Sequence, residues 1–306
     1  MLNPILSFSA TRRMRSLKTM LILLAYVAVM LLIAARILFP LLRGQASIGA
    51  LSSSTTCYAV LIAVQFVLLV LIAPAMTSGA IAGERERQTL ELLLVTNTRS
   101  FRLVLGKAME SFAMLAMLVV AGFPVMCLTL LTGGVTLGGL LAGELFLLAS
   151  AFAAVSAGIL ASSLCRSTVV SGVLSYLLIL GIGAVTALPM LFDFPESVTD
   201  VIYNRGRLAA LTSAESLRMI SPVLLCNPGY ALAALLQGQL HLFDDYMQYQ
   251  GVGRLLCEFR LMDKAGGVTI ALISSGLIVL IGLVLLALAA AAVRTMSRKP
   301  ARSGGK

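Results

Sequence analysis

The chain has 306 residues, of which 59% are hydrophobic and only 12% are charged. A typical soluble domain is about 45–50% apolar and about 25% charged, so a soluble fold would not hide this much apolar surface behind so few charges. The formal net charge is +10, and the five cysteines show no metal-ligand spacing such as C-x-x-C. The composition excludes a soluble enzyme, a disordered chain and a secreted disulfide scaffold, and it predicts a surface that faces lipid.

Six apolar segments are long enough to cross a bilayer as helices. A transmembrane helix needs about 20 mostly apolar residues, because each residue adds about 1.5 Å against a hydrocarbon core about 30 Å thick. We therefore predict an all-α, polytopic membrane protein with six transmembrane helices, in which residues 1–306 form a single transmembrane domain. The predicted spans are residues 20–39, 57–76, 111–131, 145–165, 168–192 and 268–293.

The distribution of Lys and Arg predicts how these spans are oriented. Fifteen basic residues lie in the N-terminal segment 1–19, in the connections after the second and fourth spans, and in the tail 294–306. Only Arg43 lies in the two short connections on the opposite side. Because basic loops stay in the cytoplasm, both termini of this multi-pass cell-membrane protein are predicted to be cytoplasmic. Orientation accounts for the positive charge, so no nucleic acid is expected as a partner.

The long outer segment, residues 193–266, is polar except for one apolar stretch at residues 221–236. This stretch is short for a seventh span and is interrupted by Pro222 and Pro228. A seventh span would also place the basic tail outside, so we predict a re-entrant or interfacial helical element, with a partly buried helix of an ordinary outer loop as the alternative. Cys226 and Cys257 share this segment and either form a disulfide or remain free thiols.

The segment between the second and third spans is the most informative, because its centre changes abruptly from apolar to charged and back. Gly83 can turn the chain as it leaves the membrane, and Glu84 and Glu86 favour the start of a helix. The pattern predicts a short amphipathic helix over residues 83–94, presented to the cytosol. Three leucines share one face of this helix at helical spacing: Leu90, Leu93 and Leu94.

We expect this helix to dock on a partner protein; an interfacial helix that floats on the head groups is the alternative. Anionic lipid prefers plain basic faces, whereas here Glu alternates with Arg. Further along the same coupling segment, residues 83–107, Thr98 or Ser100 can cap a second short helix that leads into the third span. The predicted docking residues are Gly83, Glu84, Arg85, Glu86, Arg87, Leu90, Leu93 and Leu94.

The same segment carries a resemblance to a known family. The run P-x-x-T-x-x-x-I-A-G-E-R-E-R-x-T-L-E-L-L-L-V-T from Pro74 to Thr96, followed by L-V-L-G-K at residues 103–107, resembles the permease subunit of type-2 ATP-binding cassette (ABC) transporters. The resemblance implies six spans, cytoplasmic termini, a coupling helix after the second span and re-entrant helices before the last. It also implies cytosolic ATP-binding cassette subunits that hold ATP and Mg, a second permease subunit (identical or related), contact with membrane lipid, and a bacterial plasma membrane.

No motif supplies chemistry of its own. The nearest match to a phosphate-binding P-loop, at Gly106-Lys107, continues with Ala108 where Ser or Thr is needed to hold magnesium. The single histidine, His241, has no recognisable cluster of ligands or catalytic partners. We therefore expect a chain that is not an enzyme and has neither cofactor nor metal, with ATP hydrolysis carried out by a partner.

Ion-coupled transport would need ionisable groups deep in the spans. Glu110 and Glu144 are predicted at the starts of the third and fourth spans, and Gln65 is a candidate for either the transport pathway or an interhelical hydrogen bond. Residues 1–19 are predicted to form an interfacial helix, with a frayed tail as the alternative. The prediction is a permease subunit for ATP-driven export; the alternatives are an ATPase-independent secondary transporter or channel, and a non-transport membrane scaffold.

Overall fold

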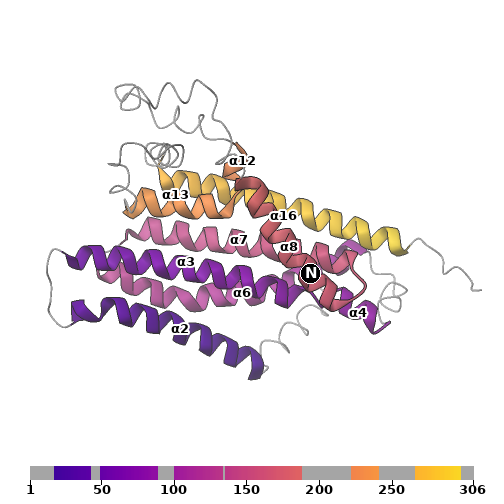
Figure 1. Ribbon diagram of the computed structural model, residues 1–306, viewed down its shortest axis with the longest axis horizontal. Helices are drawn as coiled ribbons and strands as arrows, with labels where there is room; N and C mark the ends of the chain where they lie inside the picture. The colour runs from indigo at the N-terminus through magenta and orange to yellow at the C-terminus, as the bar shows by residue number, and fades with distance from the viewer. Residues whose placement is uncertain are drawn as a thin grey trace, which may run out of the picture.

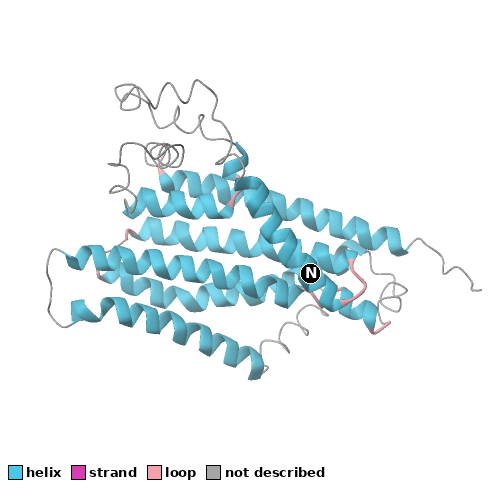
Figure 2. Ribbon diagram, in the orientation of Figure 1, coloured by secondary structure: helices cyan, strands magenta, loops and turns pink. Residues whose placement is uncertain are grey.

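A computed structural model describes residues 17–42, 49–88, 100–133, 135–187, 222–240 and 266–297. All regular elements among these residues are helices (Figure 2). His241 and most of the predicted N-terminal interfacial helix lie outside them. The helices are α2 (Leu17–Leu42), α3 (Gly49–Thr77), α4 (Ala82–Glu86), α6 (Ser100–Leu131), α7 (Leu137–Leu164), α8 (Thr168–Ala187), α12 (Pro222–Leu225), α13 (Pro228–Leu240) and α16 (Gly267–Ser297).

Six of these helices are long and apolar enough to cross a membrane, and they coincide with the six predicted spans. α2, α3, α6, α7 and α16 run side by side along the long axis of the bundle, and α8 crosses them at an angle (Figure 1). A helix pairs its backbone groups internally, as a hydrocarbon environment requires. The prediction of an all-α membrane protein with six spans is confirmed.

α7 is the centre of the bundle. Its span is 72% buried, against 11% for the span of α8. It packs against α16, α6, α3 and α8, and its many small residues let those helices approach closely. The closest approach is at Gly158, where an added Cβ would overlap the Thr77 hydroxyl of α3 and lie 2.8 Å from its Cβ. Only glycine fits at this crossing without displacing α3.

Two helices begin earlier than the apolar pattern predicts. α6 starts at Ser100 and continues unbroken, so the second short helix predicted after Thr98 or Ser100 is instead the first part of the third span's own helix. α7 starts at Leu137, with Thr136 as its N-terminal cap. Glu144 and Glu110, predicted at the starts of the fourth and third spans, therefore lie well inside the helices α7 and α6. The hydropathy pattern predicts which residues lie in the hydrocarbon core of the membrane, whereas the first and last residues of a helix depend on its caps.

The apolar stretch of the outer segment forms two short helices, α12 and α13, with a break at Asn227 before the predicted interruption at Pro228. The Asn227 side-chain oxygen accepts hydrogen bonds from two backbone N–H groups at the start of α13, and its amide donates to the Gly183 carbonyl of α8 at 2.9 Å. Cys226 is a free cysteine, and its proposed disulfide partner lies outside the described residues. Whether this element enters and leaves the membrane on one side stays a prediction.

Candidate functional site

After α3 the chain folds back on the bundle as an elbow, which we define as residues 78–88. α4 of this elbow lies at the same end of the bundle as the C-terminal end of α16 (Figure 1). The chain turns at residues 78–81 before α4 begins. Gly83, predicted to make that turn, is instead the second residue of α4. The turn comes earlier because contacts with α7 hold the backbone there.

One buried hydroxyl makes those contacts. The Oγ atom of Ser162 in α7 accepts hydrogen bonds from the backbone N–H groups of Ile81 and Ala82, each at 3.0 Å, and donates to the Ser78 carbonyl at 2.9 Å. Ser162, Ile81 and Ala82 are all 0% exposed. Because buried backbone groups need partners, this single side chain determines where the elbow lies against α7.

Two consecutive charged residues of α4 then cap two helix ends. The Arg85 guanidinium donates to the carbonyl oxygens of Cys165 (2.6 Å) and Ser163 (3.0 Å) at the C-terminal end of α7. The Glu86 carboxylate accepts a 2.9 Å hydrogen bond from the backbone N–H of Thr168, the first residue of α8. Helix C-termini attract cations and helix N-termini attract anions. Arg85 therefore carries the charge that suits the C-terminal end of α7, and Glu86 carries the charge that suits the N-terminal end of α8.

A third contact joins the elbow to α6. Glu84 Oε1 and Lys107 Nζ form an ion pair at 2.6 Å, with side chains that are 20% and 28% exposed. A partly exposed pair of this kind contributes only about 0.2–1 kcal/mol to stability. It links the elbow to α6 but adds little to the stability of the fold. Arg87 and Gln88 are exposed. α4 ends at Glu86 and Gln88 has a positive φ of 57°, so the helix predicted over residues 83–94 does not run unbroken through Gln88.

The structure thus brings three of the predicted docking residues to the chain's own helices. Glu84, Arg85 and Glu86 contact α6, α7 and α8, while Arg87 faces outward. Gly83 lies beside Thr168, since an added Cβ would be 3.4 Å from the Thr168 methyl group. Docking on a partner stays a prediction for the whole set. Leu90, Leu93 and Leu94 lie outside the described residues.

The apolar pattern did not indicate the other half of this site, on the α7–α8 turn. One signal for it is present in the sequence: only Arg166 and Ser167 separate the fourth and fifth predicted spans. So short a connection leaves helix-end carbonyl and N–H groups without local caps. An adjacent Arg and Glu elsewhere in the chain are suited to pair with both.

Gln65 lies in the bundle interior. Its side chain is 0% exposed, and its amide donates to the Val119 carbonyl of α6 at 3.5 Å. Gly122 of α6 makes room for it, since an added Cβ would lie 2.9 Å from the Gln65 amide nitrogen and 2.8 Å from the Tyr26 hydroxyl. This contact is the interhelical hydrogen bond that the sequence offered as one of two roles; a role in the transport pathway stays a prediction.

The groups of the elbow are suited to mechanical attachment. Hydrogen bonds and an ion pair join it to three helices, and within the described ranges no cluster of three or more His, Cys, Asp or Glu side chains is placed to hold a metal ion.

Comparison with known proteins covers most of the chain. No curated protein matches it. The family described as ABC-2 family transporter protein matches residues 47–291, a range that includes the elbow, the α7–α8 turn, four of the six candidate spans in full and most of the last one. Since the match extends over well more than half of the sequence, the chain belongs to the ABC-2 family of transporter proteins and is a membrane permease subunit of an ABC transporter.

Proposed function

We propose that this subunit forms the membrane pathway for export driven by separate cytosolic ATP-binding cassette subunits, and that the elbow receives their motion. The observation that carries the proposal is the pairing of Arg85 and Glu86 with the facing ends of α7 and α8. A helix held at its terminal backbone groups moves with the groups that hold it. Motion of the elbow then changes the tilt of both spans.

The residues proposed to dock on the ATPase follow, in the sequence, the elbow residues that contact the bundle. Arg87 is exposed just after α4, and the leucines at 90, 93 and 94 follow it in the sequence. In the proposal these leucines seat in a cleft of the ATPase, while residues 84–86 hold the elbow on the bundle. ATP and Mg belong to the partner, and a second permease subunit, identical or related, completes the pathway. The membrane is a bacterial plasma membrane with both termini of the chain in the cytoplasm.

Arg85→Ala is expected to uncouple the elbow from α7 and α8 without releasing the ATPase, because it removes the bonds to the α7 carbonyls and leaves the leucine face unchanged. Spin labels at Leu177 of α8 and Leu283 of α16, which are 61% and 52% exposed, report the movement of these spans. In the complex purified with its ATPase, ATP should change the distance between the labels in the parent but not in Arg85→Ala.

Arg102→Ala provides the matched control, since Arg102 is an exposed arginine of α6 outside the elbow. It should keep both ATPase binding and the ATP-dependent change. Leu93→Asp should instead lose the ATPase on purification, because it places a charge in the docking face. If Arg85→Ala moves like the parent, the elbow is not the coupling element.

The orientation of the chain can be tested with single cysteines in a cysteine-free background. Arg302→Cys in the tail should react with a membrane-impermeant maleimide only from the cytoplasmic side, because basic segments are retained there. Arg43→Cys, in the first outer connection, should react only from outside. Labelling of position 302 from outside would contradict the proposed orientation.

A further inference from the structure

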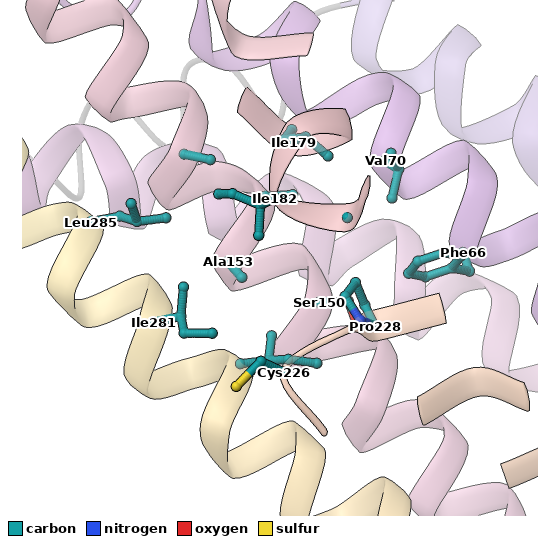
Figure 3. A pocket seen from close by; sticks show the side chains of 14 residues that line it. Phe66, Val70, Ser150, Ala153, Ile179, Ile182, Cys226, Pro228, Ile281 and Leu285 are labelled. Atoms are coloured by element: carbon teal, nitrogen blue, oxygen red, sulfur yellow. The ribbon is translucent and has the colours of Figure 1, made fainter. Parts of the chain in front are cut away.

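Most of the bundle interior is apolar. Figure 3 shows an example, a pocket of about 60 Å³ with Ile179 and Ile182 of α8 across from Ile281 and Leu285 of α16 and Ala153 of α7 between them. No charged residue is among those that line it, and apolar cavities in proteins stay dry. The polar chemistry of the interior belongs to a different place.

Four polar side chains from three helices lie together inside the bundle, and we call them the polar cluster. Tyr26 comes from α2, Tyr58 and Gln65 from α3, and Glu144 from α7. The first three are 5%, 1% and 0% exposed, whereas Glu144 is half-buried. Glu144 is the only charged residue of α7, so the most buried span carries one ionisable group well inside it. Ionisable groups within membrane spans are costly and usually have a function.

Close approach between α3 and α7 builds one side of the cluster. The Tyr58 hydroxyl lies against Gly143, where an added Cβ would overlap it, and donates to the Gly139 carbonyl at 3.4 Å. This position is next to Glu144 on α7, and the Glu144 carboxylate interacts electrostatically with the Tyr58 hydroxyl. The only polar groups that α3 brings to this level of α7 are therefore neutral.

No cation compensates Glu144 within the described ranges. The helices α3, α8 and α13 carry no charged residue, and the charged residues of α4 are paired at the elbow. The described charged side chains of the other long helices do not pair with Glu144, and they are Arg36, Arg102, Lys107, Glu110 and Arg294. The titratable groups that face Glu144 are the hydroxyls of Tyr26 and Tyr58. An ionised Glu144 is thus a partly buried charge without an opposite charge.

Two buried atoms of the cluster lack a hydrogen bond of normal geometry, the Tyr26 hydroxyl and the Gln65 Oε1 atom. The Gln65 amide nitrogen already donates to the Val119 carbonyl, and the Tyr26 hydroxyl lies beside Gln65 and near Glu144. A tyrosine hydroxyl donates one hydrogen bond, so it serves either the Gln65 oxygen or an ionised Glu144, and the other acceptor stays unpaired. Because an unpaired buried acceptor is costly, the cluster is one donor short.

We propose that Glu144 binds a proton, and that the protonated carboxyl completes a chain of hydrogen bonds through Tyr26 to Gln65. A proton from water forms an O–H bond on the carboxylate and changes its charge from negative to neutral. The new O–H group donates to the Tyr26 hydroxyl, which donates in turn to Gln65 Oε1. Both unpaired atoms then have partners, and α7 is joined to α2 and α3. Loss of the proton breaks this chain, so the cluster is a pH-sensitive link among three spans, whatever the role of the elbow.

Infrared spectra of the full chain, purified in a maltoside detergent that has no carbonyl group, test the proton site directly. At about pH 6 exposed carboxylates are ionised, because their usual pKa is about 4, whereas a protonated Glu144 gives a carboxylic-acid C=O band. We expect this band in the parent, its loss at alkaline pH and its absence from Glu144→Gln. The control Glu110→Gln, which removes an acid well inside α6, should keep it. If the parent lacks the band, or Glu144→Gln retains it in full, Glu144 does not hold the proton.

Two further measurements test the hydrogen-bond chain. Tyr26→Phe keeps the acid but removes the hydroxyl that accepts its hydrogen bond, so the band should remain and shift in frequency; an unshifted band would overturn the chain. The unfolding temperature of the parent should also fall between about pH 6 and about pH 8, because the ionised cluster has an unpaired acceptor and an uncompensated charge. Glu144→Gln should lose this fall, and Glu110→Gln should keep it. An equal fall in Glu144→Gln would mean that the link does not depend on the proton.

Discussion

Ser162→Ala is expected to detach the elbow from α7 and to lower the stability of the protein markedly. Three backbone groups, the N–H groups of Ile81 and Ala82 and the carbonyl of Ser78, depend on this one hydroxyl. Each buried polar group left without a partner costs about 1–3 kcal/mol, so a loss on the order of 3 kcal/mol or more is expected. Thermal unfolding in detergent, followed by a thiol-reactive dye, measures it.

Ser163→Ala is the matched control for this experiment. Ser163 is also 0% exposed, but its hydroxyl donates only to the Leu160 carbonyl of its own helix, at 2.7 Å. The neighbouring variant therefore makes the same chemical change without removing support from the elbow, and its unfolding temperature should stay close to that of the parent. Equal losses in Ser162→Ala and Ser163→Ala would mean that the elbow does not depend on Ser162.

Gly158→Ala is expected to push α3 away from α7. The added methyl group would overlap the Thr77 hydroxyl and meet the Thr77 Cβ at 2.8 Å, and neither helix can yield easily in the bundle centre. Overpacking of a close-packed interior costs about 1–3 kcal/mol and occasionally more. The measurement is the yield of monodisperse protein together with its unfolding temperature.

Thr77→Ala in the Gly158→Ala background should restore part of this loss, because it removes the hydroxyl and methyl groups of Thr77 but keeps its Cβ. The double-mutant cycle isolates the contact between the two positions. Gly276→Ala in α16 provides the control, since an added Cβ there meets nothing within 4 Å. If the second change rescues nothing, the α3–α7 crossing is not the source of the defect.

The spans were predictable because a lipid-facing helix needs apolar residues whatever it packs against. Thr168 was correctly predicted as the first residue of the fifth span, where the α7–α8 turn ends. The first residues of α6 and α7 were not, although their last residues were predicted to within one position. In α6, Lys107 and Glu110 lie outside the apolar run yet are compatible with a helix that begins before it. Hydropathy reports where the membrane lies, and the helix ends depend on local caps.

The charged centre of the elbow was recognised, but its contacts were not. Arg85 and Glu86 pair with backbone groups of residues about 80 positions further along the chain. Every residue has such groups, so the sequence does not distinguish Cys165 or Thr168 as partners. The helix-forming charges of α4 follow local rules, whereas the attachment depends on tertiary packing.

The attachments of α8 make it a lever. Its N-terminal end is fixed to Glu86, its middle is held where the Tyr176 hydroxyl donates to the Leu71 carbonyl of α3 at 2.8 Å, and Gly183 near its other end is fixed to Asn227. At a rise of 1.5 Å per residue, the arms on either side of Tyr176 measure about 12 Å and about 10 Å. A rigid helix that rotates about the Tyr176 contact moves its two ends in opposite directions. Because the two arms are nearly equal in length, the two displacements are similar in size. Under the proposed coupling, an inward step at one face of the membrane would become an outward step at the other.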